Sequence, residues 1–305
     1  MALGDELLSA CQSAKTEVVL AAPFIKLRAL QRLISVIAPQ VPVTVIVRFL
    51  PTDLAAGVTD FEIVEYLRKR ENTQLRGHSV IHAKLYRIDD RVMIGSANLS
   101  DRALGWHYKP NLELLLEVHS GNAIVREIEK RILRTSYPLT AEIASAVFAA
   151  AQRLSPPASP EGTETAEAAG NERLWIPACM RPQILWEVQK HGDFAGATRR
   201  VVEAAKRDLA YLSIPDGLDK SSFEDVAQGI FKSSPFYELL ATALVGAGLT
   251  DQEGAAWLDR ECGSHLDESA ADTWVTVKNW LRHFATDATY ISAFSERTTL
   301  SRVIG

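Results

Sequence analysis

The side chains best suited to chemistry in this sequence lie in one short stretch, HAKLYRIDDRVMIGSANLS. His82 and Lys84 alternate with apolar neighbours, so on an extended strand their side chains share one face. The chain then turns, and a second apolar run, RVMIG, leads back to Ser96 and Asn98. We therefore expect the imidazole, amine, hydroxyl and carboxamide of these residues to converge at one edge of a sheet.

This set of groups suits the displacement reaction at a phosphodiester. A neutral imidazole is a nucleophile and its protonated form is an acid, so two facing imidazoles supply both halves of the reaction. Lys84 and Asn98 would place positive charge and hydrogen-bond donors where the phosphoryl oxygens gain negative charge. A solvated strand face without function is the alternative that an isolated His-x-Lys leaves open.

The spacing resembles the HKD signature of the phospholipase D superfamily, with the pattern His82-x-Lys84-x4-Asp89 and then Gly95-Ser96-x-Asn98. Five residues separate Asp89 from Gly95, one fewer than in the usual pattern, and a tighter hairpin would absorb the difference. The resemblance covers residues 1 to about 139. It implies an α/β fold, a mixed sheet with helices on both faces.

The resemblance also implies a role for each residue of the signature. His82 would attack the phosphorus and form a phosphohistidine, while Lys84 and Asn98 hold the phosphoryl oxygens. Ser96 belongs to the turn that presents Asn98. A second histidine, from another copy of the signature, would protonate the leaving oxygen, and neither a metal nor another cofactor is required.

Two carboxylates accompany the signature. A nucleophilic histidine needs its proton held on the correct nitrogen, usually by a carboxylate. Glu113, in Asn111-x-Glu113, stands where the family carries an acidic residue that orients the histidine. Asp89 is expected to be a structural hydrogen-bonding group.

The chain carries a single copy of the signature. A second His-x-Lys, formed by His107 and Lys109, is not another copy, because Leu114 stands where the aspartate belongs. We therefore expect a homodimer whose two-fold axis passes through the site. A loop at the rim is expected to stack on bases and contact phosphate, with a packed surface loop as the alternative; its residues are Trp106, His107, Tyr108 and Lys109.

Apolar strands alternate with amphipathic helices in the first half, which favours an α/β layer covered on both faces. The expected strands are 17–23, 43–50, the two in the stretch from 82 onward, and 111–118; the expected helices are 27–37, 60–70, 122–133 and a short one at 140–154. On the first strand of the pair, Ile81, Ala83 and Leu85 should point into the core. Residues 1–154 are thus expected to form the catalytic domain.

The second half reads as a separate, mostly α-helical domain. Residues 155–172 are rich in Pro, Ser, Gly, Ala and Glu and lack aliphatic or aromatic anchors, which predicts a flexible linker. Residues 173–305 contain helix-start signals at Ser221, at Thr250 and at Ser234 before a proline. A stripe of apolar residues, Trp274, Val277, Leu281 and Phe284, indicates core packing. We expect this domain to recognise a target or a protein partner.

Composition narrows the functional classes. The first 150 residues hold 18 basic and 16 acidic side chains, the remainder 15 and 22, so any polyanion must be bound by a local patch in the first half. No apolar run reaches the roughly 18 residues that span a bilayer, so we expect a cytoplasmic protein without membrane contact. Neither the three cysteines nor the pair His78 and His82 has the spacing of a metal site.

The sequence therefore predicts a metal-independent phosphodiesterase, with nucleic acid, and DNA rather than RNA, as the expected substrate, in phage defence or restriction. Lipid, DNA and RNA share the same reacting group, so a phospholipid hydrolase remains an alternative. The acidic second half also leaves open a binding or scaffold subunit of a multi-protein defence system.

Overall fold

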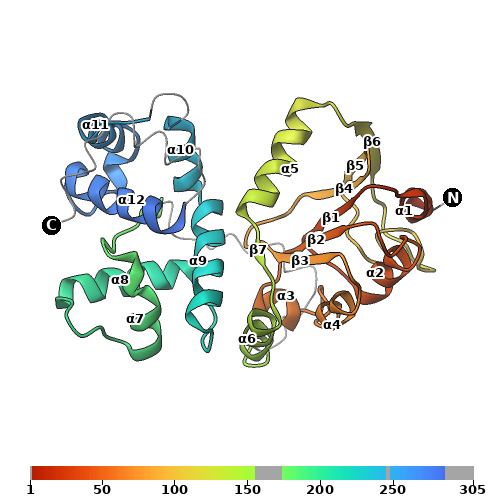
Figure 1. Cartoon of the computed structure of the whole chain (residues 1–305), viewed down its shortest axis with the longest axis horizontal. Helices are drawn as coiled ribbons and strands as arrows, with labels where there is room; N and C mark the ends of the chain where they lie inside the picture. Colours follow the sequence, from red (N-terminus) through yellow and green to blue (C-terminus); the bar gives the residue numbers. More distant parts are fainter. Residues whose placement is uncertain (1, 155–173, 245–247, 286–305) are drawn as a thin grey trace. The chain divides into compact units, whose positions relative to one another are not determined.

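The computed structural model describes residues 2–154, 174–244 and 248–285. The chain divides into two compact units, Met1–Glu167 and Ala168–Gly305 (Figure 1). The linker expected at 155–172 lies outside the described residues.

The first unit is built on a mixed sheet of seven strands in the order β6-β5-β4-β1-β2-β3-β7. Three of the strands are parallel: β1 (Val18–Ala22), β2 (Val43–Val47) and β3 (Thr73–Gly77). The others run antiparallel to their neighbours: β4 (Lys84–Ile88), β5 (Arg91–Gly95), β6 (Leu115–His119) and the short β7 (Tyr137–Pro138). Every residue of β1 is buried, as expected for a strand covered on both faces.

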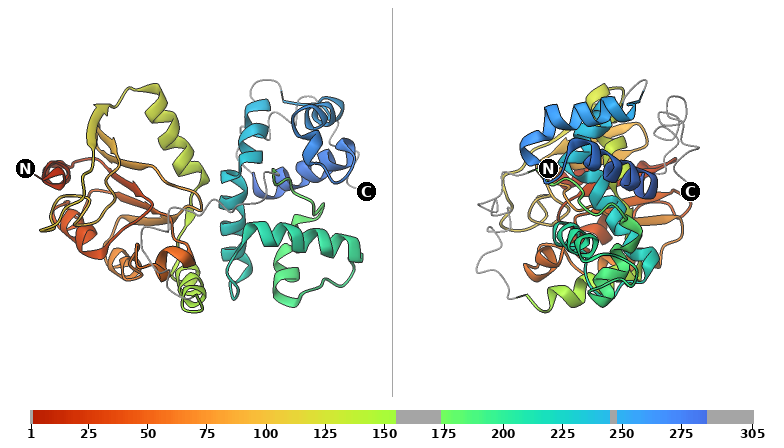
Figure 2. Two further views of the ribbon diagram at one scale, coloured as in Figure 1. Left: turned by 180° about the vertical axis from the view of Figure 1, so that it is seen from behind. Right: turned by 90° about the vertical axis from the view of Figure 1, so that its left-hand side faces the viewer.

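Helices lie on both faces of this sheet (Figures 1 and 2). They are α1 (Leu3–Ser13), α2 (Leu27–Ile34), α3 (Pro51–Ala55), α4 (Ile63–Arg68), α5 (Ala123–Thr135) and α6 (Ala141–Ala151). Helix α5 covers one face, where its Val125 and Ile132 join a core cluster with β1 and β4 residues such as Val19 and Leu85. The predicted α/β fold with a mixed sheet is confirmed.

Register brings the ends of several strands to one edge of the sheet. Ala22 of β1 pairs with Val47 of β2, which pairs with Gly77 of β3, so the carboxyl ends of the parallel strands lie together. Because β4 is antiparallel to β1, its start lies at the same edge, opposite the end of β5 and next to the start of β6. We call this the site edge.

Two sequence predictions at the site edge were wrong in detail, and two elements of the first unit were not predicted. The strand begins at Lys84 rather than at His82, so Ala83 is exposed instead of facing the core, whereas Ile81 and Leu85 are buried. The apolar run at 111–118 forms strand only from Leu115, at the outer edge of the sheet, and three of its leucines are exposed: Leu112, Leu114 and Leu116. The strand β3, with its polar sequence TQLRG, and the helix α1 were not predicted.

The second unit is helical within its described residues. Its elements are η2 (Pro182–Ile184), α7 (Leu185–His191), α8 (Arg199–Leu212), α9 (Lys220–Ser233), α10 (Pro235–Ala243), α11 (Asp251–Cys262), η3 (Gly263–His265) and α12 (Ala270–Phe284). The side chains of Ser234 and Thr250 cap α10 and α11 as predicted. The start predicted at Ser221 was wrong, because Asp219 caps α9 instead. The predicted apolar stripe of α12 is buried in the core.

Candidate active site

His82 and Lys84 occupy the site edge at the start of β4. The His82 side chain is exposed, directly before the strand. Lys84 is only 8% exposed, and its Nζ donates a hydrogen bond to the carbonyl oxygen of His82, 2.9 Å away. The ammonium group is therefore held against the backbone that carries the imidazole, so positive charge and a potential nucleophile lie side by side.

The turn after β5 is fixed against β4 by two close contacts. Gly95 pairs with Lys84, and a Cβ added at Gly95 would lie 1.9 Å from the carbonyl oxygen of Leu114, so no larger residue fits there. Tyr86, fully buried on β4, donates its hydroxyl hydrogen to the carbonyl oxygen of Ala97 at 2.6 Å. Burial, and secondarily the Glu113 carboxylate, raise the pKa of Tyr86, so it remains a donor. Tyr86 thus holds the turn that bears the polar residues of the signature.

Ser96 and Glu113 form a hydrogen-bonded pair at this edge. The Ser96 hydroxyl donates to Glu113 Oε2 at 2.5 Å and accepts from the backbone N–H of Leu114 at 3.0 Å. Asn111 donates to Glu113 Oε1 at 3.2 Å. Ser96 and Asn111 therefore already orient the Glu113 carboxylate, which lies at the site edge with the residues of the signature.

Asn98 retains unmet hydrogen-bonding capacity. Its Oδ1 atom is buried and has no hydrogen-bond partner within the described residues. The backbone around it is well anchored, because Leu99 bridges to Ile25 after β1. A buried polar atom without a partner costs free energy, and such atoms cluster at functional sites.

Asp89 lies at the opposite end of β4, away from the site edge. It occupies a two-residue turn between Ile88 and Arg91, with φ at +52°. Its carboxylate accepts the backbone N–H groups of Lys15, Thr16 and Glu17. Desolvation would raise the pKa of Asp89, but these bonds and the Thr16 hydroxyl lower it to about 2. Asp89 therefore ties the hairpin to the segment before β1, and the tight turn accommodates the shortened spacing to Gly95.

The loop expected at the rim follows Asn98 and leads directly to Asn111. Trp106 does not project freely from it: its indole N–H donates to Asp5 at 3.0 Å, and the Arg32 guanidinium lies 4.1 Å from its ring centre. Packing against α1 and α2 thus occupies this side chain. The neighbouring Tyr108, also expected at the rim, is 83% exposed.

Around Tyr108 the loop is both aromatic and cationic. The ring of His107 lies 4.3 Å from the Tyr108 ring, centre to centre, and the Lys109 ammonium lies 5.6 Å from it. The His107 Nδ1 atom also accepts the backbone N–H of Lys109 at 3.1 Å. Of the rim residues, the structure therefore leaves His107, Tyr108 and Lys109 together on the surface.

His78, considered from the sequence only as a metal ligand, is buried and anchors the segment before His82. The Nδ1 atom of His78 accepts the backbone N–H of Val80, so its Nε2 donates to the Thr135 hydroxyl of α5, 2.7 Å away. Burial, and then the nearby Arg131, lower the pKa of His78 to about 4. The neutral ring thus links α5 to the loop that carries His82.

Within the described residues, no three side chains of the His, Cys, Asp or Glu type are grouped so that they could hold a metal ion. A search of the same residues for a helix long and apolar enough to cross a membrane also found none.

Comparison with known protein families identifies a match within the first unit. The family model described as "Cardiolipin synthase, PLD-like domain" matches residues 7–135. No curated protein matches the chain.

Similar solved structures include NucT from Helicobacter pylori, at 22% identity over 42% of this chain and 84% of that one, with a TM-score of 0.35. Nuc from Salmonella typhimurium, a phospholipase D family member, is 20% identical over 42% and 83%, with a TM-score of 0.35. A phosphatidylserine synthase from Haemophilus influenzae is 16% identical over 49% and 40%, with a TM-score of 0.39. By the family match, residues 7–135 of this chain, which contain the HKD residues at the site edge, form a phospholipase D-like domain.

Proposed function

We propose that the chain is a metal-independent nuclease that cleaves DNA through a phosphohistidine on His82. The observation that carries this proposal is the pairing at the start of β4, where an exposed imidazole adjoins a largely buried ammonium group bonded to its own backbone. Lys84 can neutralise the charge that develops on the phosphoryl oxygens without a metal ion. Asn98 adds a carboxamide at the same edge, whose N–H group would be the one that donates to a phosphoryl oxygen.

The second histidine of the reaction is proposed to come from a second copy of the chain. One chain carries one signature, and a two-fold axis through the site edge would bring two His82 side chains to the same phosphate. Exposed leucines beside Glu113 support such a contact, since Leu112 is 102% exposed, Leu114 55% and Leu116 54%. The residue opposite the nucleophile would then protonate the leaving oxygen.

Nucleic acid is the proposed substrate because of the loop that leads from Asn98 to Asn111. An exposed aromatic ring with a cation beside it can stack on an unpaired base and contact the adjacent phosphate. Tyr108 and Lys109 provide this combination close to the site edge. The second unit, with residues 173–305, is proposed to recognise a target or a protein partner.

The nuclease proposal is tested by incubating the full chain with plasmid and single-stranded DNA in excess EDTA. Cleavage is expected in the wild type and should fall by at least ~10³-fold in His82→Ala, because removing a covalent nucleophile eliminates the main pathway. His119→Ala is the matched control, since His119 is exposed on β6 at its far end from the site edge.

Three outcomes would contradict this proposal. Cleavage that needs a divalent metal would remove the proposed mechanism. Hydrolysis of phosphatidylglycerol without hydrolysis of DNA would make the chain a phospholipid hydrolase. Inactivity on both substrates, with stable binding to another protein, would make it a scaffold subunit.

A further inference from the structure

Seven cations of the first unit form ion pairs with nearby carboxylates of the described residues. The ion pairs are Lys26 with Asp60, Arg28 with Asp101, Arg48 with Asp53, Arg68 and Lys69 with Glu65, Arg87 with Glu17 and Glu129, and Arg91 with Glu6 and Glu117. Arg70 and Arg76 donate to backbone and hydroxyl oxygens instead. These side chains are committed within the fold, so positive charge that attracts a polyanion must come from the other cations of the unit.

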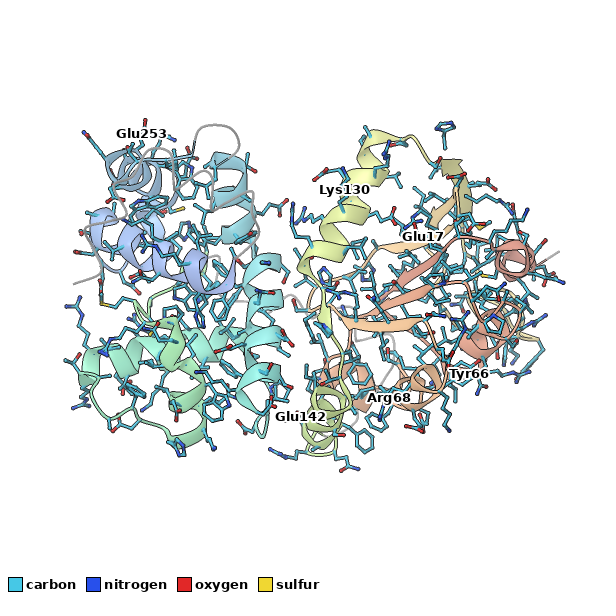
Figure 3. The ribbon with its side chains drawn as sticks, in the orientation of Figure 1. Glu17, Tyr66, Arg68, Lys130, Glu142 and Glu253 are labelled. Carbon is cyan, nitrogen blue, oxygen red and sulfur yellow. The ribbon has the colours of Figure 1, made fainter. Side chains whose placement is uncertain are left out.

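Helix α5 carries cations that are not among these committed side chains. Arg126, Lys130 and Arg134 are exposed, and none of them forms an ion pair with a carboxylate of the described residues. Their spacing of four residues places them in one row along the helix. Lys130 projects from α5 away from the sheet (Figure 3). We call these three residues the α5 row.

The α5 row leads toward the site edge. The helix ends at Thr135, whose hydroxyl contacts His78, and Ser136 then bonds Arg76 of β3. The next residue, Tyr137, pairs with Gly77 at the carboxyl end of β3. Arg134 is therefore the member of the row nearest the site edge, and Arg126 the farthest. The loop anchored by His78 connects this end of α5 to His82.

The dimensions of the row fit a phosphate backbone. At about 1.5 Å per residue, the row from Arg126 to Arg134 extends about 12 Å. Successive phosphates of one duplex strand rise by about 3.4 Å, so such a row spans on the order of three of them. Neutralising backbone phosphates is the main source of affinity in proteins that bind nucleic acid without sequence preference.

We infer that the α5 row binds backbone phosphates of a nucleic-acid substrate to one side of the scissile phosphate. This inference rests on the proposed nuclease function and adds a substrate-binding surface to it. A membrane surface fits less well, because interfacial helices combine cations with a broad apolar face. On α5 only Ile124 and Ile128 are exposed large apolar side chains, and the opposite side of the helix is committed to the core.

The test measures binding of a short fluorescein-labelled DNA to the full chain carrying His82→Ala, which prevents cleavage. In this background, R126Q/K130Q/R134Q should weaken DNA binding about tenfold to hundredfold at moderate salt. The slope of log affinity against log salt should also fall by about 2 to 3, at ~0.9 for each phosphate that the variant no longer neutralises. All three residues are exposed, so the thermal midpoint should remain close to that of the parent.

The matched control is R68Q/K69Q/R153Q, which removes the same number of exposed cations from α4 and from the end of α6. Arg68 belongs to α4, on the other face of the sheet (Figure 3). This control should keep the DNA affinity and the salt slope of the parent.

Equal weakening in both triple variants, or in neither, would overturn the inference. Absence of DNA binding by the parent would overturn it too, and hydrolysis of bis(4-nitrophenyl) phosphate by the wild type would then show whether the phosphodiesterase site itself stands. Binding to phosphatidylglycerol vesicles that depends on the α5 row, with no dependence for DNA, would assign the row to a lipid surface instead.

Discussion

Tyr86 connects the two strands of the signature through one buried hydrogen bond, from its hydroxyl to the Ala97 carbonyl oxygen. In Tyr86→Phe this carbonyl loses its partner in a buried position, at a cost of about 1–3 kcal/mol. The turn bearing Ser96 and Asn98 should then be less firmly placed. We expect kcat to fall about tenfold, with a much smaller change in KM, measured by steady-state DNA cleavage.

Tyr66→Phe is the control for Tyr86→Phe, because Tyr66 lies on α4, outside the site edge (Figure 3). Its activity should match that of the wild type. Full activity in Tyr86→Phe would show that the hydroxyl bond does not position the turn.

His78 makes stability depend on pH. Its pKa of about 4 lies below the ordinary value of 6.5, because burial and Arg131 disfavour the charged ring. The unfolded chain therefore binds the proton more readily, and stability that is complete above pH 6.5 is lost as the pH falls toward 4. The loss attributable to His78 is about 2 kcal/mol at pH 5.

This dependence can be measured as the drop in thermal midpoint between pH 7.5 and pH 5. His78→Gln should be less stable than the wild type at pH 7.5 but should lose less on acidification, because the titrating ring is gone. An identical drop in both proteins would contradict the role given to the buried imidazole.

Only some of the residue contacts at the site can be predicted from the sequence. The convergence of His82, Lys84, Ser96 and Asn98 follows from the alternation of side chains along two adjacent strands, which is a local property. The contact between His78 and Thr135 joins residues 57 positions apart, and no local pattern encodes it. The packing of Trp106 against Asp5 and Arg32 could not be predicted either, because both partners are far away in sequence.

The edge strand β6 is the element on which the proposed dimer depends. Its outer side has no neighbouring strand within the described residues, and such edges are sites of association. In L112S/L116S we expect the protein to become monomeric by light scattering and to lose DNA cleavage, because the two His82 side chains no longer meet. Both leucines are exposed in the single chain, so its folding should be retained.

L239S/V275S is the matched control for the β6 variant, since Leu239 and Val275 are 45% and 42% exposed in the helical unit. It should remain dimeric and active. A dimeric L112S/L116S, or a wild type that is monomeric and active, would rule out this interface.

At the element scale, prediction succeeded where the hydrophobic pattern was strong. The apolar runs of β1 and β2 and the amphipathic pattern of α5 were readable directly. The strand β3 has only one buried residue, Gly77, and owes its conformation to pairing with β2 and β7, so its own residues gave no signal. The exposure of residues 111–118 could not be predicted, because a leucine-rich run is typical of a core strand and of an exposed interface alike.

At the scale of the whole molecule, the residues proposed for catalysis and substrate binding lie in one unit, apart from the helical unit. The residues of the HKD signature and the α5 row all lie in the first unit. The second unit is helical within its described residues, and its sequence carries most of the net negative charge. The composition alone shows this difference in net charge between the two units. The position of the α5 row relative to the site edge could be found only from the folded structure.

The proposed reaction as a whole depends on a covalent intermediate formed by one of two facing histidines. The direct measurement is rapid quenching of the full chain during cleavage of DNA in EDTA, followed by mass spectrometry of the intact protein and its peptides. We predict a nucleotide adduct on His82, absent in His82→Ala, at no more than one for every two chains. Cleavage without an adduct, or with the adduct on another residue, would contradict the account.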